Sequence, residues 1–316
     1  MSSSALLVAL ITTLILGVCC FAGMRLVFPA LREAPAAQAQ NFAGRTVAYG
    51  LGLVWLFFAL GMLTLHVFLK NTILSLCPVA QLPVVILILI SMVLGFVDDV
   101  YGSSASRGFK GHIKSLLSGK LTTGGLKLFG ISAAAFLVAM MMAPTTNGMV
   151  LYGVGQSSVM TMKTLLPAAG YGLLAGAGIA LTSNFLNLCD LRPGRALKVY
   201  FLLAVIGLII VGFTNDLPVA LLSALIVLIP LGAIFGYDLR ELGMLGDTGA
   251  NPFGVLAGCL IVFGCGSHYI ALAVYVFFML LLNLASEKFS FSQLISNNKF
   301  LSKVDNLGRL DKGKKK

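Results

Sequence analysis

Four aspartates stand out in a chain that contains only 11 acidic residues among 316. Asp98 and Asp99 are adjacent in GFVDDVYGSS, Asp190 lies in NFLNLCDLRPGRALK, and Asp247 lies in GMLGDTGANPFG. Adjacent carboxylates repel each other and partial burial penalises both charges, so a site that keeps them favours a bound cation. Mg²⁺ takes oxygen ligands and often uses one or two carboxylates together with substrate phosphates. The aspartates therefore predict an acidic magnesium and phosphate site, and solvated helix ends are the alternative.

Polar and basic residues next to these aspartates extend the candidate site. Asn184, Asn187 and Asp190 recur every three residues, which places them on one helical face suited to phosphate or sugar hydroxyls. Helix capping explains the same spacing equally well. Arg192 and Arg195 follow directly and are candidates for substrate binding.

A basic, glycine-rich segment, RGFKGHIKSLLSGKLTTGGLK, follows the aspartate pair and ends at Lys127. Lysines and backbone amides at a glycine-rich helix start bind phosphate well. A plain positive loop at the inner membrane surface explains its charge equally well. The three histidines are too separated for a metal cluster, and the six cysteines form no CxxC pair with metal spacing.

Composition indicates which elements must position these residues. Hydrophobic residues make up 58% of the chain, charged residues 10%, and the mean hydropathy is +0.97. Apolar runs recur near the length of about 20 residues that crosses a bilayer as a helix. The sequence therefore predicts an all-α, polytopic membrane protein of about nine transmembrane helices, at about 5–24, 47–69, 82–97, 125–143, 163–183, 199–213, 217–236, 252–264 and 268–286.

The basic residues predict the orientation of these helices. With the N-terminus outside and the C-terminus cytoplasmic, all of the 22 Lys and Arg residues except Lys70 and Lys163 face the cytoplasm. The net charge of +11 then belongs to one membrane face, which suits lipid headgroups and phosphorylated substrates and not nucleic acid. We expect one transmembrane catalytic domain over 1–286 and a basic cytoplasmic tail over 287–316.

Taken in order, four segments resemble the polyprenyl-phosphate N-acetylhexosamine-1-phosphate transferases, which include the phospho-N-acetylmuramoyl-pentapeptide transferases (glycosyltransferase family 4). They are NFAGRTVAYGLG at 41–52, GFVDD at 95–99, the stretch 184–190, and LGDTGA at 245–250. The resemblance runs from about 41 to 258. It implies Mg²⁺-dependent transfer of a sugar 1-phosphate from a nucleotide-sugar, expected to be UDP-linked, to a membrane polyprenyl phosphate in cell-envelope synthesis. It also implies a multi-pass protein of the bacterial plasma membrane with a cytoplasmic active site, and leaves a homodimer open.

The resemblance further assigns roles to individual residues. Asp98 would contact or deprotonate the lipid phosphate, and Asp99 and Asp247 would hold the metal. Asn187 and Asp190 would position the donor phosphates and the metal-bound waters, and Lys127 would contact the pyrophosphate.

The chain also departs from the family. Pro193 stands where members commonly have a second Asp, three residues after the position of Asp190. Tyr237 and Asp238 replace an aromatic residue followed by Asn, and a His-rich motif in the last inner loop is missing. Two alternatives therefore remain: an altered relative that binds lipid phosphate or scaffolds envelope enzymes, and a secondary transporter, which would carry ionisable residues near the bilayer midplane.

Overall fold

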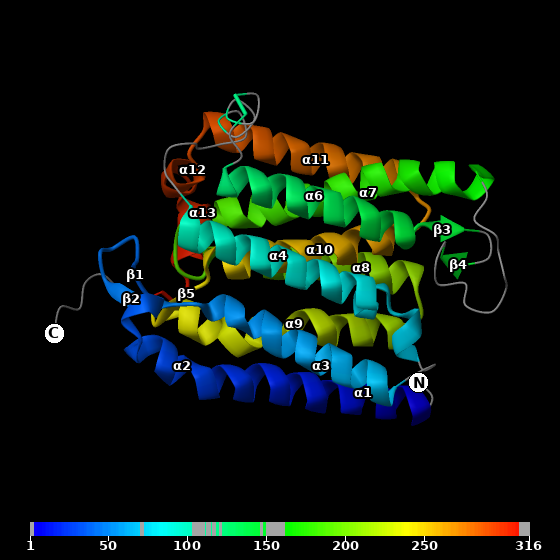
Figure 1. Cartoon of the computed structure of the whole chain (residues 1–316), viewed down its shortest axis with the longest axis horizontal. Helices are drawn as coiled ribbons and strands as arrows, with labels where there is room; N and C mark the ends of the chain where they lie inside the picture. Colours follow the sequence, from blue (N-terminus) through cyan, green and yellow to red (C-terminus); the bar gives the residue numbers. More distant parts are fainter. Residues whose placement is uncertain are drawn as a thin grey trace.

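The structure is a computed structural model that describes residues 3–69, 73–102, 111, 115, 118–119, 122–145, 148–149 and 162–309. Within these residues, nine helices are long and apolar enough to cross a membrane. This confirms a helical, multi-pass membrane protein. The spans lie side by side in one bundle and run in alternating directions, with the first helix starting at one end and the C-terminal helices lying at the other (Figure 1).

The first span is a continuous helical rod in which a π-helical turn, η1 (Val18–Ala22), separates two α-helices. The helices are α1 (Ser3–Gly17), α2 (Gly23–Glu33), α3 (Val54–Phe68), α4 (Leu82–Tyr101), α6 (Thr123–Met141), α7 (Met162–Cys189), α8 (Arg195–Thr214), α9 (Leu217–Leu239), α10 (Gly246–Cys265), α11 (Tyr269–Lys288), α12 (Phe291–Asn297) and α13 (Lys299–Asn306). Short 3₁₀ turns are η2 (Pro35–Ala37), η3 (Leu51–Leu53), η4 (Ile73–Leu76) and η5 (Pro78–Ala80).

Several predicted boundaries are wrong in the same direction. The first span continues to Glu33 and not to residue 24, and α7 continues to Cys189 and not to 183. The eighth span starts at Gly246 and not at 252, so Asp247 lies in a helical first turn and not in a loop. Backbone hydrogen bonding continues past the last apolar residue, because polar side chains at a helix end reach the headgroup region. One start is wrong in the other direction, since residues 46–49 form a strand and the second span begins at 51.

Helix α10 is the centre of the bundle, and all residues of its apolar window are buried. Gly254 and Gly258 let it contact α7 closely, since a Cβ at Gly254 would lie 2.5 Å from Cα of Ser183. Gly172 and Gly176 of α7 meet α6 in the same way. Glycines four residues apart on one helix let a neighbouring helix approach closely, and both pairs have this role here.

A small sheet adds strands that the all-α prediction did not include. Its order is β1 (Gln38–Gln40), β2 (Thr46–Tyr49) and β5 (Gly243–Met244), with β1 antiparallel and β5 parallel to β2. A second pair, β3 (Pro144–Thr145) and β4 (Gly148–Met149), is antiparallel and lies at the other end. The three-stranded sheet joins the segment after α2 to the residues just before α10.

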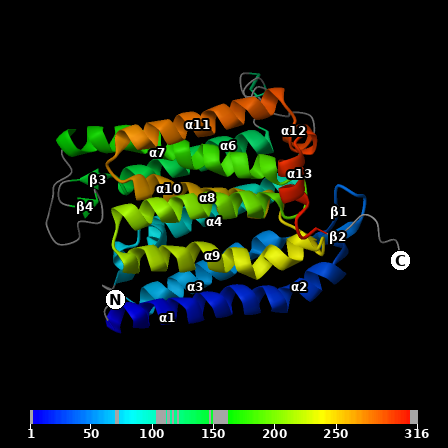
Figure 2. The same cartoon turned by 180° about the vertical axis from the view of Figure 1, so that it is seen from behind.

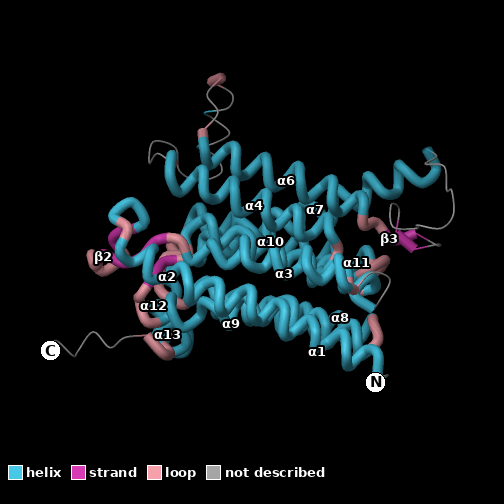
Figure 3. Tube along the Cα trace, turned by 60° about the horizontal axis from the view of Figure 1, so that its bottom comes forward, coloured by secondary structure: helices cyan, strands magenta, loops and turns pink. Residues whose placement is uncertain are grey.

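The described parts of the segments predicted to face the cytoplasm lie at the same end of the bundle. We call that end the charged end. It contains the C-terminal ends of α2, α4, α7 and α9, the N-terminal ends of α6, α8 and α10, the three-stranded sheet, and the helices α12 and α13 (Figures 1 and 3). The predicted loop lysines and arginine at 107, 110, 114 and 120, and the final lysines from 312 onward, lie outside the described residues.

Candidate functional site

Asp99, in the last turn of α4, binds the start of α10. Its Oδ1 accepts the backbone N–H of Asp247 at 3.0 Å. Its Oδ2 accepts the backbone N–H of Thr248 at 2.8 Å and the hydroxyl of Thr248 at 2.5 Å. The first N–H groups of a helix have no partner within the helix, and the helix dipole favours a negative charge there. Asp99 therefore fixes the distance and rotation between α4 and α10.

Two glycines make this close approach sterically feasible. A Cβ on Gly95 would lie 2.3 Å from the carbonyl oxygen of Asp247. Gly246 has φ +67°, where side chains are strained, and a Cβ there would lie 2.5 Å from the Tyr49 hydroxyl. Burial raises the pKa of Tyr49, and the nearby carboxylate of Asp99 raises it further, so Tyr49 is a neutral hydroxyl beside the acids.

Lys127, in the first turns of α6, joins Asp98 to Asp247. Its ammonium lies 2.7 Å from Oδ2 of Asp98 and also donates to Oδ2 of Asp247. The lysine side chain is only 10% exposed. Thr122 holds the helix start in place by accepting the Gly125 N–H at 3.0 Å. Three spans, α4, α6 and α10, thus bring one cation between two carboxylates.

Asp190 reaches the same place from the turn after α7. Its Oδ2 accepts the N–H of Gly246 at 3.0 Å. Burial raises the pKa of Asp190 well above its usual range, and the neighbouring carboxylates of Asp238 and Asp247 raise it further. Gly246, Asp247 and Thr248 are consecutive, so all four predicted aspartates meet around the start of α10. We call Asp98, Asp99, Asp190, Asp247 and Lys127 the acidic cluster.

The donor set of the acidic cluster fits Mg²⁺ in chemistry. Four carboxylates and one ammonium leave three negative charges when every group is ionised, and hard oxygen ligands suit a hard cation. In the part of the chain that the structure describes, no group of three or more His, Cys, Asp or Glu side chains is arranged to hold a metal ion. Mg²⁺ needs only one or two carboxylates when waters and substrate phosphates complete its shell. Asp98 and Asp247 are the two carboxylates that the Lys127 ammonium bridges, whereas both oxygens of Asp99 accept hydrogen bonds from α10.

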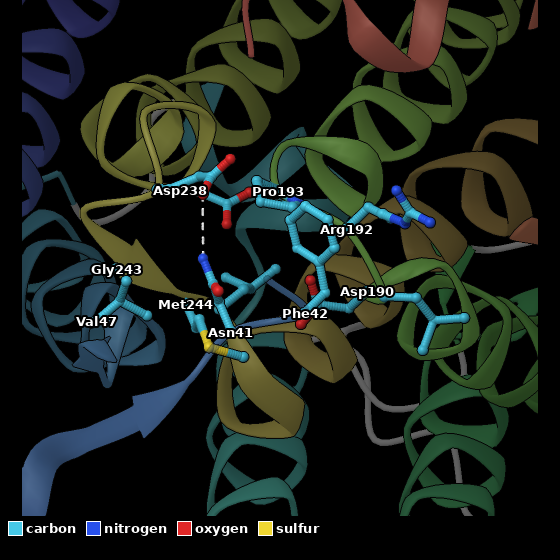
Figure 4. A pocket seen from close by; sticks show the side chains of 12 residues that line it. Asn41, Phe42, Val47, Asp190, Arg192, Pro193, Asp238, Gly243 and Met244 are labelled. Carbon is cyan, nitrogen blue, oxygen red and sulfur yellow. Dashed lines mark hydrogen bonds between the residues drawn. The ribbon is translucent and has the colours of Figure 1, made fainter. Parts of the chain in front are cut away.

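A small cavity of about 50 Å³ adjoins the acidic cluster at Asp190 (Figure 4). Around it lie the loop before β2, the turn after α7 and the segment between α9 and α10. It is lined by Asn41, Phe42, Val47, Asp190, Leu191, Arg192, Pro193, Asp238, Glu241, Gly243, Met244 and Leu245. Asp190 is therefore shared between the acidic cluster and this cavity.

The cavity wall is held by polar and cation–π contacts. Glu241 accepts hydrogen bonds from Asn41 at 3.1 Å and from Arg45 at 3.0 Å. The guanidinium of Arg192 lies 4.8 Å from the ring centre of Phe42, and that of Arg309 lies 5.2 Å from it. Arg192 is thus placed at the cavity, in agreement with a binding role, and Figure 4 shows it beside the Phe42 ring.

Arg195, the second predicted binding arginine, is engaged elsewhere. Its Nε and Nη2 donate to the two carboxylate oxygens of Asp305 at 2.7 and 2.9 Å, and its Nη1 donates to Ser292 at 2.8 Å. Its side chain is 5% exposed. Bidentate, buried guanidinium–carboxylate pairs are geometrically specific. Arg195 therefore fastens α12 and α13 to the start of α8, which sequence spacing alone did not indicate.

The Arg195–Asp305 pair makes stability dependent on pH. Burial alone would raise the pKa of Asp305, but the hydrogen bonds and the positive charge of Arg195 hold this pKa below its usual range. A depressed pKa stabilises the fold above the unfolded pKa of about 4, and this contribution is lost as pH falls through the folded value. We expect Asp305→Asn to lower the free energy of unfolding by about 2 kcal/mol at pH 7, less than for a fully buried pair.

Melting temperatures of wild type and Asp305→Asn between pH 7 and pH 3 test this expectation. The difference between the two proteins should shrink toward pH 3, while Asp216→Asn, an exposed acid at the opposite end of the bundle, should match wild type throughout. A difference that stays constant with pH would show that the ion pair does not provide the stability.

Sequence reasoning placed Asn187 in the site, and the structure uses its backbone, whose carbonyl accepts the Asp190 N–H at 3.0 Å. Three further residues were missed as site members. Thr248 and Tyr49 lie inside quoted motifs, so their hydroxyls were a usable signal. Asp238 is buried and accepts the N–H of Gly194 at 2.8 Å, a contact between segments 44 residues apart that no local pattern reveals.

Comparison of the chain with models of known protein families and with curated proteins gives no match. The family resemblance therefore remains a prediction that rests on the motifs, and the function is argued from the site.

Proposed function

We propose that this protein transfers a sugar 1-phosphate from a nucleotide-sugar, UDP-linked in the first instance, to the phosphate of a membrane polyprenol. The observation that carries the proposal is the meeting of Asp98, Lys127 and Asp247 from three spans, with Asp99 and Asp190 bound to the same helix start. An acidic cluster with one buried lysine at a bilayer boundary suits a reaction between two phosphorylated substrates.

Phosphoryl transfer between two anions depends on charge neutralisation and in-line positioning more than on covalent catalysis. The Lys127 ammonium can donate to a substrate phosphate oxygen from the position where it now meets two carboxylates. Asp98 can accept a proton from, or orient, the attacking lipid phosphate. Mg²⁺ would neutralise the donor pyrophosphate, and Asp98 and Asp247 are the residues that would hold it. Asp99 positions the start of α10, and Asp190 orders the turn between the acidic cluster and the cavity.

The proposed setting is the cytoplasmic side of a bacterial plasma membrane. The charged end carries most of the described basic residues, as expected for a cytoplasmic face. Nucleotide-sugars are water-soluble and polyprenyl phosphates are membrane-bound, so a site at the end of the spans serves both. The acids lie at helix ends and not at mid-bilayer, which favours this enzyme over a secondary transporter.

Purified protein, undecaprenyl phosphate, Mg²⁺ and a panel of nucleotide-sugars labelled in the sugar provide the direct test. We expect label to enter the lipid fraction with release of the nucleoside monophosphate from at least one donor, and chelation of Mg²⁺ to stop it. Asp216→Asn, at the opposite end, is the matched control and should keep full activity. Absence of lipid labelling from every donor, in protein that binds the lipid, would contradict the proposal.

One observation favours a second candidate, a relative that binds lipid phosphate without turnover. Pro193 lines the cavity where the family resemblance leads one to expect a second Asp, so the donor side lacks one acid. Native mass spectrometry would then show bound polyprenyl phosphate, and no donor would be consumed. Any turnover of a donor excludes this candidate.

A further inference from the structure

Helices α12 and α13 lie across the charged end of the bundle. They follow α11, which ends at Lys288, after only two residues. Figure 2 shows α13 running across the ends of the spans and not along them. In a bilayer that surrounds the spans, a helix with this direction would run parallel to the membrane surface, at the level of the lipid headgroups.

One face of α13 is fixed to the bundle. Asp305 makes the bidentate pair with Arg195, and Nζ of Lys198 donates to the carbonyls of Val304 at 3.1 Å and Asp305 at 2.8 Å. Gly308 follows the helix and leaves room for Leu239, since a Cβ there would lie 2.8 Å from that side chain. The rotation of α13 about its axis is therefore set by contacts on the Asp305 side.

One flank of α13 is apolar and exposed. At about 100° per residue, Phe300 and Val304 of α13, and Leu307 directly after it, lie roughly 100–160° around the helix axis from Asp305. They are 72%, 42% and 68% exposed. Lys299 and Lys303 border one edge of this stripe and are also exposed. An apolar stripe bordered by lysines is the pattern of a helix that lies in a membrane interface.

The charge of this face indicates which kind of molecule would bind to it. Asp305 is the only acid in α13 and points to the bundle, so the outward face carries lysines and no carboxylate. Beyond the described residues the sequence adds Lys312, Lys314, Lys315 and Lys316. A surface that offers both acyl chains and negative phosphates complements these features, and each lysine near it adds roughly a fivefold preference for anionic lipid.

We propose that α13 is an interfacial helix that binds anionic phospholipid in the leaflet at the charged end. Phe300, Val304 and Leu307 lie among the upper acyl chains, and Lys299 and Lys303 contact lipid phosphates. Arg309 extends from the same segment to the Phe42 ring, so the segment after α13 also contacts the cavity wall. This inference does not depend on the proposed transferase activity.

Nitroxide labels in nanodiscs test the orientation of α13. The variant Phe300→Cys reports on the apolar face and Asn306→Cys, also exposed, on the polar flank; five of the six native cysteines are buried, and labelled wild type corrects for the sixth. In discs of phosphatidylcholine with phosphatidylglycerol, we expect the label at 300 to be accessible to oxygen and protected from a water-soluble nickel reagent. The label at 306 should show the reverse.

The double charge reversal Lys299→Glu with Lys303→Glu separates anionic lipid from other occupants. The double variant should lose the protection of the label at 300 from the nickel reagent in discs that contain phosphatidylglycerol. Without the two charge reversals, this protection should be weaker in discs of pure phosphatidylcholine. A label at 300 that the nickel reagent reaches in both lipids overturns the proposal. Protection from both reagents would mean that a second copy or another protein covers this face, and it would also overturn the proposal. Protection that depends neither on lipid charge nor on the two lysines would overturn the proposal as well.

Discussion

Asp98→Asn is expected to lower the rate of the proposed sugar-phosphate transfer by at least about 100-fold while the melting temperature stays close to wild type. The carboxylate of Asp98 meets Lys127 at 2.7 Å and, through it, Asp247. An amide of the same shape keeps the packing and removes the charge that would hold a cation or orient the lipid phosphate. Initial rates at saturating donor and lipid, with thermal unfolding of the same samples, measure both quantities.

The variant Asp99→Asn is the comparison for Asp98→Asn, because the two adjacent aspartates have different contacts. Both oxygens of Asp99 accept hydrogen bonds from the start of α10, and an amide nitrogen cannot accept any of them. We therefore expect Asp99→Asn to lose activity and also to lose about 1–3 kcal/mol of stability. Asp98→Asn protein with wild-type turnover would remove the proposed site, and equal melting temperatures for Asp99→Asn and wild type would remove its positioning role.

The architecture was predictable because lipid imposes strong rules on sequence. Apolar runs predicted the correct number of spans among the described residues. The ends of the helices were not predictable from hydropathy. Asp98, Asp99 and Asp247 are polar, yet they continue the backbone hydrogen bonding of α4 and α10, and only the contact between the two helices shows why.

The candidate site was predictable in its acids and not in their partners. Scarcity made Asp98, Asp99, Asp190 and Asp247 conspicuous in the sequence, and the structure brings them together. The different roles of these aspartates depend on contacts between distant parts of the chain. Asp99 accepts hydrogen bonds from backbone N–H groups of α10, 148 residues away, and backbone groups carry no sequence signal. Arg195 likewise looked like a binding residue because its partner, Asp305, lies 110 residues later in a segment read as tail.

Gly95→Ala should be strongly disruptive although Gly95 bears no functional group. The added Cβ would lie 2.3 Å from the carbonyl oxygen of Asp247, and backbone cannot rotate away as a side chain can. Helices α4 and α10 must then separate, at a cost of about 1–3 kcal/mol. A displacement of about 1 Å between Asp98 and Asp247 can lower the rate roughly 100-fold. Thermal unfolding and initial transfer rates measure the two effects.

Gly212→Ala is the matched control, since Gly212 lies in α8 and a Cβ there would meet nothing within 4 Å. It should leave both stability and transfer unchanged, because alanine is also the better helix former. Gly95→Ala protein with normal activity and stability would mean that α4 and α10 are not in backbone contact. The acidic cluster would then lose its geometry, because Asp99 reaches the α10 N–H groups only at that separation.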